Sequence, residues 1–135
     1  WQGDNHLELA KKLLRDADYE GALKEYEDVL RLFPESWPGD GALYYMGLIR
    51  VHPENPQRDY KKALECFHRL VGDFPGSPLR EETEVWIGVA EALIGYKTET
   101  KDLRETVTTL KDQLNALKEI DIGIEEKKRE DLPGK

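Results

Sequence analysis

Residues 18–36 of this 135-residue chain read DYEGALKEYEDVLRLFPES, and residues 59–77 read DYKKALECFHRLVGDFPGS. The second copy begins about 41 positions after the first, and both contain Asp-Tyr, then Ala-Leu, then an aromatic residue and a final Phe-Pro-x-Ser. Self-similarity with a period of about 20–50 residues is typical of helical repeat arrays. The repeated stretch therefore predicts an all-α fold made of stacked helix hairpins.

The first hairpin is predicted from residues 7–15 and 19–32, where apolar residues recur every three or four positions. Asp18 is placed to cap the second of these helices. Pro34 is placed to end it, because proline cannot donate the next backbone hydrogen bond. Two amphipathic helices joined by a tight turn are the expected result.

Two further hairpins are predicted by the same reasoning, from helices over about residues 42–51, 59–74 and 79–94 and a sixth starting near Thr100 or Asp102. Asp40 is available as the cap of the third helix, and Ser77 with Pro78 marks the start of the fifth. Gly47 indicates a close approach between helices, since glycine inside a helix costs about 1 kcal/mol relative to alanine.

The sixth helix is predicted to carry a heptad-like apolar seam. Its members alternate at spacings of four and three: Leu103, Val107, Leu110, Leu114 and Leu117. The helix is expected to continue through Ile124 and to lose order at Pro133-Gly134. A seam of this length points to pairing with another helix.

Composition excludes several classes of function. The net charge is −8 with 36% charged residues, a balance that repels nucleic acid and anionic membrane surfaces. Cys66 is the only cysteine, so an internal disulfide is excluded, and no apolar run reaches the 18 residues of a membrane span. Because the chain begins at Trp1, we expect that a signal or anchor segment, or simply a trimmed piece, preceded it.

The repeat resembles the tetratricopeptide repeat in its small, aromatic and proline positions. The first unit has Leu9-Ala10, Tyr19, Ala22, Tyr26, Val29-Leu30 and Pro34, and the second has Met46-Gly47, Tyr60, Ala63, Phe67, Leu70-Val71 and Pro75. The resemblance implies a right-handed α-solenoid of three hairpins, over about residues 4–34, 41–75 and 78–117. Residues 118–135 are then a C-terminal helix extension and a disordered tail. The third unit keeps Ile87-Gly88 but lacks a closing proline, which suits a terminal capping unit.

The two Phe-Pro-x-Ser endings are similar to those of tetratricopeptide proteins of the bacterial envelope. That subtype includes the lipoprotein of the β-barrel assembly machinery and the Tol-associated periplasmic coordinator, while the Leu-rich C-terminal helix weakly resembles lipoproteins that accompany sensor kinases. The resemblance implies a periplasmic or outer-membrane-associated scaffold without cofactors, with a cytosolic adaptor as the alternative.

In the resembling family, the first helix of each hairpin lines a concave surface that binds a peptide or helix of a partner. Carried onto this sequence, that partner-binding surface is predicted at Leu7, Lys11, Arg15, Tyr44, Leu48, His52, Val85 and Val89. An apolar lining favours an apolar peptide or helix over an acidic tail. The alternative is that these residues simply pack between hairpins. A second docking site, for self-association or for another helix, is predicted at Leu110, Leu114, Leu117 and Ile124.

No catalytic or metal-binding motif is predicted. His6, His52 and His68 do not share a helical i, i+4 spacing with a carboxylate, and Cys66 and His68 point to different faces. Glu81, Glu82 and Glu84 are explained by the first turn of a helix, where acidic side chains suit the helix dipole. We therefore expect a non-enzymatic protein.

Overall fold

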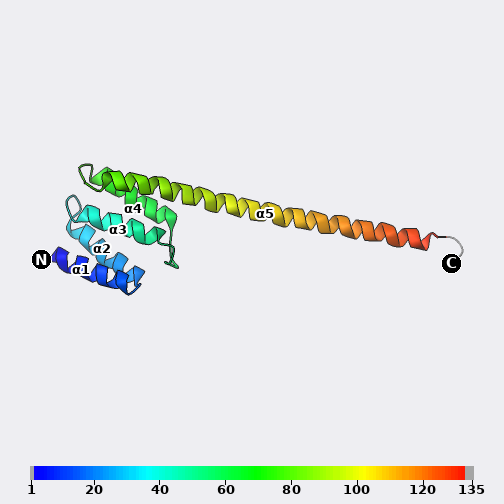
Figure 1. Ribbon diagram of the computed structural model, residues 1–135, viewed down its shortest axis with the longest axis horizontal. Coiled ribbons are helices and arrows are strands. Elements are labelled where there is room, and N and C mark those ends of the chain that lie inside the picture. The colour runs from blue at the N-terminus through cyan, green and yellow to red at the C-terminus, as the bar shows by residue number, and fades with distance from the viewer. Residues whose placement is uncertain (1, 133–135) are drawn as a thin grey trace. The chain divides into compact units, whose positions relative to one another are not determined.

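The computed structural model describes residues 2–132, and within them the chain is helical without strands (Figure 1). Its helices are α1 (Gln2–Arg15), α2 (Tyr19–Leu32), α3 (Gly39–Val51), α4 (Tyr60–Asp73) and α5 (Arg80–Glu130). The predicted all-α helical repeat class is confirmed. The chain divides into two units, Trp1–Gly95 and Tyr96–Lys135, which are described separately.

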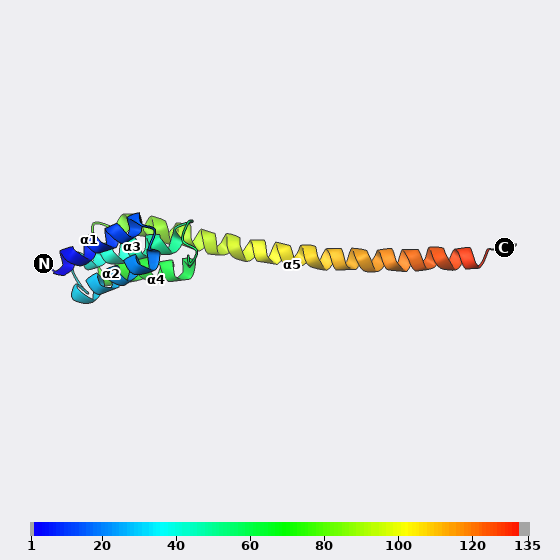
Figure 2. The ribbon, with the colours of Figure 1, turned by 90° about the horizontal axis from the view of Figure 1, so that it is seen from below.

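The first unit contains the two repeated hairpins, α1 with α2 and α3 with α4 (Figure 2). Small residues lie where helices approach, and larger side chains fill the space between them, as the repeat pattern predicts. The buried core comprises Ala10, Ala22, Leu23, Tyr26, Val29, Leu30, Ala42, Leu43, Met46, Ile49, Leu70 and Phe74. This core joins both hairpins into one packed body.

The turn between α1 and α2 satisfies the backbone groups at both helix ends. The Asp18 carboxylate accepts from the Gly21 amide at 2.9 Å, as predicted for a cap. The Ala17 amide donates to Leu14 and the Asp18 amide to Leu13, which is the paired arrangement of a Schellman turn. Ala17 occupies the left-handed position of this turn with φ 58°.

Glycines fix two close approaches in the first unit. A Cβ on Gly47 would lie 2.5 Å from Phe67 Cζ, so the predicted close contact between α3 and α4 is confirmed. A Cβ on Gly39 would overlap the Phe33 carbonyl oxygen and lie 3.0 Å from its carbonyl carbon. Both positions therefore exclude any larger residue without a shift of the packed elements.

The start of α3 differs from the prediction. Asp40 is not its cap; the cap position is Pro38, which has no side-chain hydrogen bond there, and Asp40 lies inside the first turn. The buried Asp40 carboxylate accepts from the Gly41 amide at 2.9 Å and from the Ser77 hydroxyl at 2.5 Å. Asp40 thus links the start of α3 to the segment before α5. Its carboxylate bonds the distant Ser77 instead of capping its own helix.

The loop between α3 and α4, which contains Pro53 and Pro56, is organised by one buried side chain. The Asn55 amide donates to the Ile49 carbonyl at 3.0 Å, while its oxygen accepts from the Gln57 amide at 3.0 Å. Asp59 then caps α4 by accepting from the Lys61 and Lys62 amides. The insertion is therefore hydrogen-bonded to the helices it connects.

The predicted third hairpin is wrong. Instead of a turn followed by a sixth helix near Thr100 or Asp102, α5 is continuous from Arg80 to Glu130. Residues 95–102 contain no proline, and a single glycine there weakens a helix without ending it. The division between units falls after Gly95, whereas the sequence placed a domain boundary after residue 117. The predicted loss of order at Pro133-Gly134 lies outside the described residues.

Candidate interaction surface

The predicted concave residues differ in how accessible they are. Leu7 and Tyr44 are half-buried and pack against the core, and Leu48 is also half-buried. Lys11 and Arg15 are exposed on α1, where Lys11 lies 3.6 Å from Glu8 in an ion pair. Leu7 and Tyr44 are therefore partly used in packing between helices, which is the alternative to a binding role.

Tyr44 links α3 to the first turns of α5. Its hydroxyl donates to the Glu82 carboxylate at 3.2 Å. Burial is the main cause that raises the pKa of Tyr44, with further increases from Glu82 and Tyr45 and an opposing hydrogen bond from Trp86. Trp86 in turn stacks on Phe67 of α4, with ring centroids 6.5 Å apart. The beginning of α5 is therefore held against both helices of the second hairpin.

The next turns of α5 leave an apolar face uncovered. Val85 is 67% exposed and Val89 39% exposed, and Ala92 is exposed one turn further on. On the opposite side of the same helix, Thr83 and Ala90 are fully buried. Val85 lies one turn after Glu82, the residue that Tyr44 contacts, and Val85 and Val89 are the exposed apolar members of the predicted surface.

His52 lies away from that part of the surface. Its ring is tilted against Tyr19 at the start of α2, with centroids 5.3 Å apart, and its Nδ1 accepts from the Glu54 amide at 3.1 Å. These contacts place His52 at the end of the hairpins, beside the loop after α3. It is therefore better explained as part of the loop packing.

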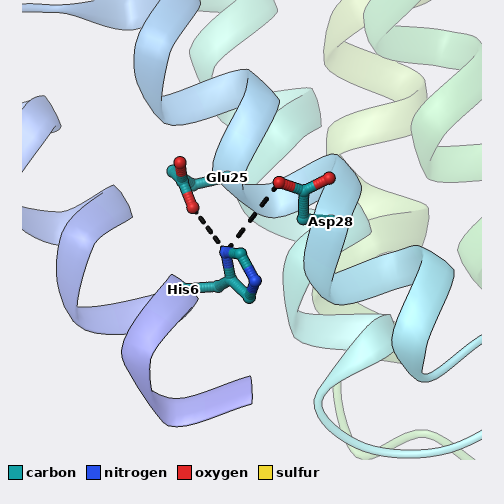
Figure 3. A group of neighbouring side chains, drawn as sticks. All are labelled: His6, Glu25 and Asp28. Carbon is teal, nitrogen blue, oxygen red and sulfur yellow. Dashed lines mark hydrogen bonds and ion pairs between the residues drawn. The ribbon is translucent and has the colours of Figure 1, made fainter. Parts of the chain in front are cut away.

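A polar cluster that sequence spacing did not reveal joins α1 to α2 (Figure 3). His6 Nδ1 lies 2.5 Å from the Glu25 carboxylate and 3.9 Å from that of Asp28, which also pairs with Arg31 at 2.8 Å. His6 is separated from Glu25 by 19 positions, so no local motif marks it. The i, i+3 placement of Glu25 and Asp28 on one face of α2 is the only sequence signal.

This cluster offers one nitrogen and two carboxylate oxygens that lie within 4.8 Å of one another, a spacing a metal ion could bridge. The spacing of these residues in the sequence does not predict such a grouping. The histidine and carboxylates already satisfy one another through a hydrogen bond and an ion pair. The contact between two neighbouring helices explains the cluster without a metal.

Cys66 has the character of a packing residue. It is half-buried against the core of the first unit. Burial is the main cause that raises the pKa of its thiol. A raised pKa disfavours the thiolate, which is the reactive form of cysteine.

The second predicted docking site lies on residues 96–132, all of which are exposed. The seam residues Leu103, Val107, Leu110, Leu114, Leu117 and Ile124 are 48% to 63% exposed. The apolar positions predicted for helix docking are therefore accessible on α5.

The fold is an all-α helical repeat, and its second hairpin is similar to a tetratricopeptide repeat. The model of the family described as "Tetratricopeptide repeat" matches residues 41–77, which include α3 from Gly41 onward, the following loop, α4 and the segment up to Ser77. This match supports a tetratricopeptide repeat protein, a class whose repeats generally mediate protein–protein interactions and are typically non-catalytic. No curated protein and no solved structure was found to match the chain. Among residues 2–132, no helix combines the length and apolar character needed to cross a membrane.

Proposed function

We propose that this protein is a non-catalytic scaffold that binds an apolar peptide or helix of a partner protein on its repeat surface. The observation that carries the proposal is the uncovered face of α5 at Val85 and Val89, next to the Tyr44–Glu82 contact. Burial of apolar side chains that are exposed in the free protein is the main favourable contribution in most protein–protein association. The half-buried Tyr44, which contacts Glu82 one turn before Val85, adds an aromatic side chain beside this face.

A peptide-display selection against the whole chain tests this surface. Peptides selected on the unaltered protein should be apolar, and their binding should weaken at least about tenfold in Val85→Glu with Val89→Glu, because a buried carboxylate lacks a partner. Leu32→Glu is the matched control, since Leu32 is also 39% exposed but lies on α2. Equal loss in the control, or no loss in the double variant, would reject the Val85–Val89 face.

We further propose that the scaffold works in a bacterial envelope, in the periplasm or at the outer membrane. The support is the pair of aromatic-Pro-x-Ser endings at Phe33 and Phe74. The coding sequence upstream of Trp1 tests this directly: a signal peptide ending in a lipidated cysteine is expected, together with recovery of the protein from the envelope fraction. Recovery with cytosolic markers would favour the alternative, a cytosolic adaptor.

A second candidate function is assembly through the C-terminal part of α5. The specific observation in its favour is the accessible seam from Leu103 to Ile124. This function does not depend on the Val85–Val89 face.

A further inference from the structure

Residues 96–132 present an apolar stripe that nothing in the described chain covers. Its repeat is a regular heptad, in which one row is Tyr96, Leu103, Leu110, Leu117 and Ile124 and the other is Thr100, Val107, Leu114 and Asp121. These rows occupy the d and a positions of a coiled coil, respectively. At 1.5 Å per residue, the stripe from Tyr96 to Ile124 is about 43 Å long. It therefore extends over about four heptads.

The helix has few internal means of stabilising itself. Within residues 96–132, the ion pair between Glu125 and Lys128, at 3.9 Å, is the one formed. The hydroxyls of Thr106 and Thr108 bond back to the carbonyls of Asp102 and Arg104, a pattern that weakens helices slightly. Most helical stability in proteins comes from the packing of an apolar face rather than from intrinsic helix propensity. Covering the seam would therefore stabilise this helix.

The side chains at the two rows favour a two-stranded partner arrangement. Leucine occupies three successive d positions, at Leu103, Leu110 and Leu117, while the a positions include the β-branched Thr100 and Val107. Leucine at d with β-branched residues at a favours parallel dimers over trimers and tetramers. The residues at the a and d positions thus favour pairing of α5 with one other helix.

Charges beside the seam favour a parallel over an antiparallel arrangement of the two helices. The e row, which flanks the d positions, is basic at Lys97, Arg104, Lys111 and Lys118, whereas the g row has Glu99 followed by the uncharged Thr106 and Gln113. In an antiparallel pair of identical helices, e rows face e rows, so these cations would repel one another. In a parallel pair, each e residue faces a g residue, which places Arg104 opposite Glu99 and the other cations opposite uncharged side chains.

We propose that α5 pairs with α5 of a second copy of this chain, forming a parallel, in-register, two-stranded coiled coil from Tyr96 to Ile124. The a and d rows of the two copies bury each other, and Glu99 of each copy pairs with Arg104 of its partner. Asp121 is the one charged residue in the a and d rows between Tyr96 and Ile124. It lies opposite its own copy, so the two carboxylates repel each other and weaken the pair.

Sedimentation of the whole chain over a range of concentrations tests the pairing. The expected mass is twice the 15.6 kDa of one chain. Leu110→Glu with Leu114→Glu should return the mass to that of one chain. The circular dichroism of the helices in the first unit should persist, because Leu110 and Leu114 are exposed. A monomer at all concentrations, or a trimer, would overturn the proposal.

Cross-linking tests the direction and the register. In a Cys66→Ser background, Val107→Cys should form a disulfide-linked dimer on mild oxidation, because parallel in-register helices bring equivalent a positions together. Thr108→Cys, one residue along and off the seam, is the matched control and should remain monomeric on a denaturing gel. Equal cross-linking at both positions, or none at Val107→Cys, contradicts an in-register parallel pair.

Reversing the charge at Arg104 distinguishes a parallel from an antiparallel dimer, because the change should weaken association in one and strengthen it in the other. Arg104→Glu should weaken a parallel dimer by about tenfold, since it faces Glu99 twice in the symmetric pair, and adding Glu99→Lys should restore it. In an antiparallel dimer, Arg104→Glu would instead strengthen association by relieving repulsion between cations. Stronger association of the single variant would therefore refute the parallel arrangement. Asp121→Leu should strengthen the parallel pair, and an unchanged or weaker association would also contradict it.

Discussion

Gly47 of α3 faces Phe67 of α4 so closely that an added Cβ would lie 2.5 Å from Phe67 Cζ. Gly88 occupies the corresponding position one repeat later in the sequence, yet no atom of a neighbouring element lies within 4 Å of a Cβ placed there. The two glycines come from the same repeat position but have opposite surroundings. This difference arises because α5 continues as one helix and provides no partner helix for a third hairpin.

Gly47→Ala should therefore destabilise the protein by about 1–3 kcal/mol, because Phe67 is fully buried and cannot move aside. Gly88→Ala should instead stabilise it by about 0.5–1 kcal/mol through helix propensity alone. Urea unfolding followed by circular dichroism measures both. Destabilisation by Gly88→Ala would show that a helix packs on that face in solution.

Ala17→Gly should stabilise the turn between α1 and α2 by about 1 kcal/mol. Ala17 has φ 58°, where an L-residue with a Cβ is strained and glycine is not. Ala10→Gly provides a contrast, since Ala10 is buried in α1 and its loss of a methyl group should destabilise the protein. A lower unfolding midpoint for Ala17→Gly would contradict the left-handed turn.

Ser77→Ala should cost about 1–3 kcal/mol of unfolding free energy. It removes the hydroxyl that donates to the buried Asp40 carboxylate and accepts from the Leu79 amide. Ser36 ends the first copy of the repeat at the equivalent position but is exposed, so Ser36→Ala should change stability by less than about 0.5 kcal/mol. If the two substitutions had equal effects, the bond between Ser77 and Asp40 would not matter for stability.

Tyr26 should make the fold sensitive to alkali. Burial, with a smaller contribution from Tyr45, raises the pKa of Tyr26 to about 12, from about 10 in the unfolded chain. Because the folded pKa is higher, the stabilisation from this group is complete below pH 10 and is lost as the pH rises from about 10 to 12.

Comparison of the unaltered protein with Tyr26→Phe isolates that effect. The difference in unfolding free energy between the two should be constant up to about pH 9. By about pH 11.5 the unaltered protein should have lost about 2 kcal/mol of stability relative to Tyr26→Phe. The phenylalanine variant lacks this ionisation, while both proteins share the titration of their lysines. Parallel stability curves over the whole range would mean that the Tyr26 pKa is the same in the folded and unfolded chains.

The repeated pattern predicted the first two hairpins because each depends on local chemistry. Asp18 and Asp59 cap the helices that they precede, and the alanine and aromatic positions of both copies are buried as the periodicity requires. The accessible surface was less predictable. Val85 and Val89 have the same apolar character as Leu7 and Tyr44, and only packing distinguishes the exposed pair from the half-buried pair.

The sequence by itself determined an all-α repeat, since periodicity, caps and prolines act within one turn of helix. It also determined the heptad seam of α5, whose spacing is a property of the chain alone. Only the tertiary structure decided that Asp40 would bond Ser77, that His6 would meet Glu25, and that Gly88 would remain uncovered. These outcomes depend on which residues distant in sequence come within a few ångströms, and local patterns do not encode that distance.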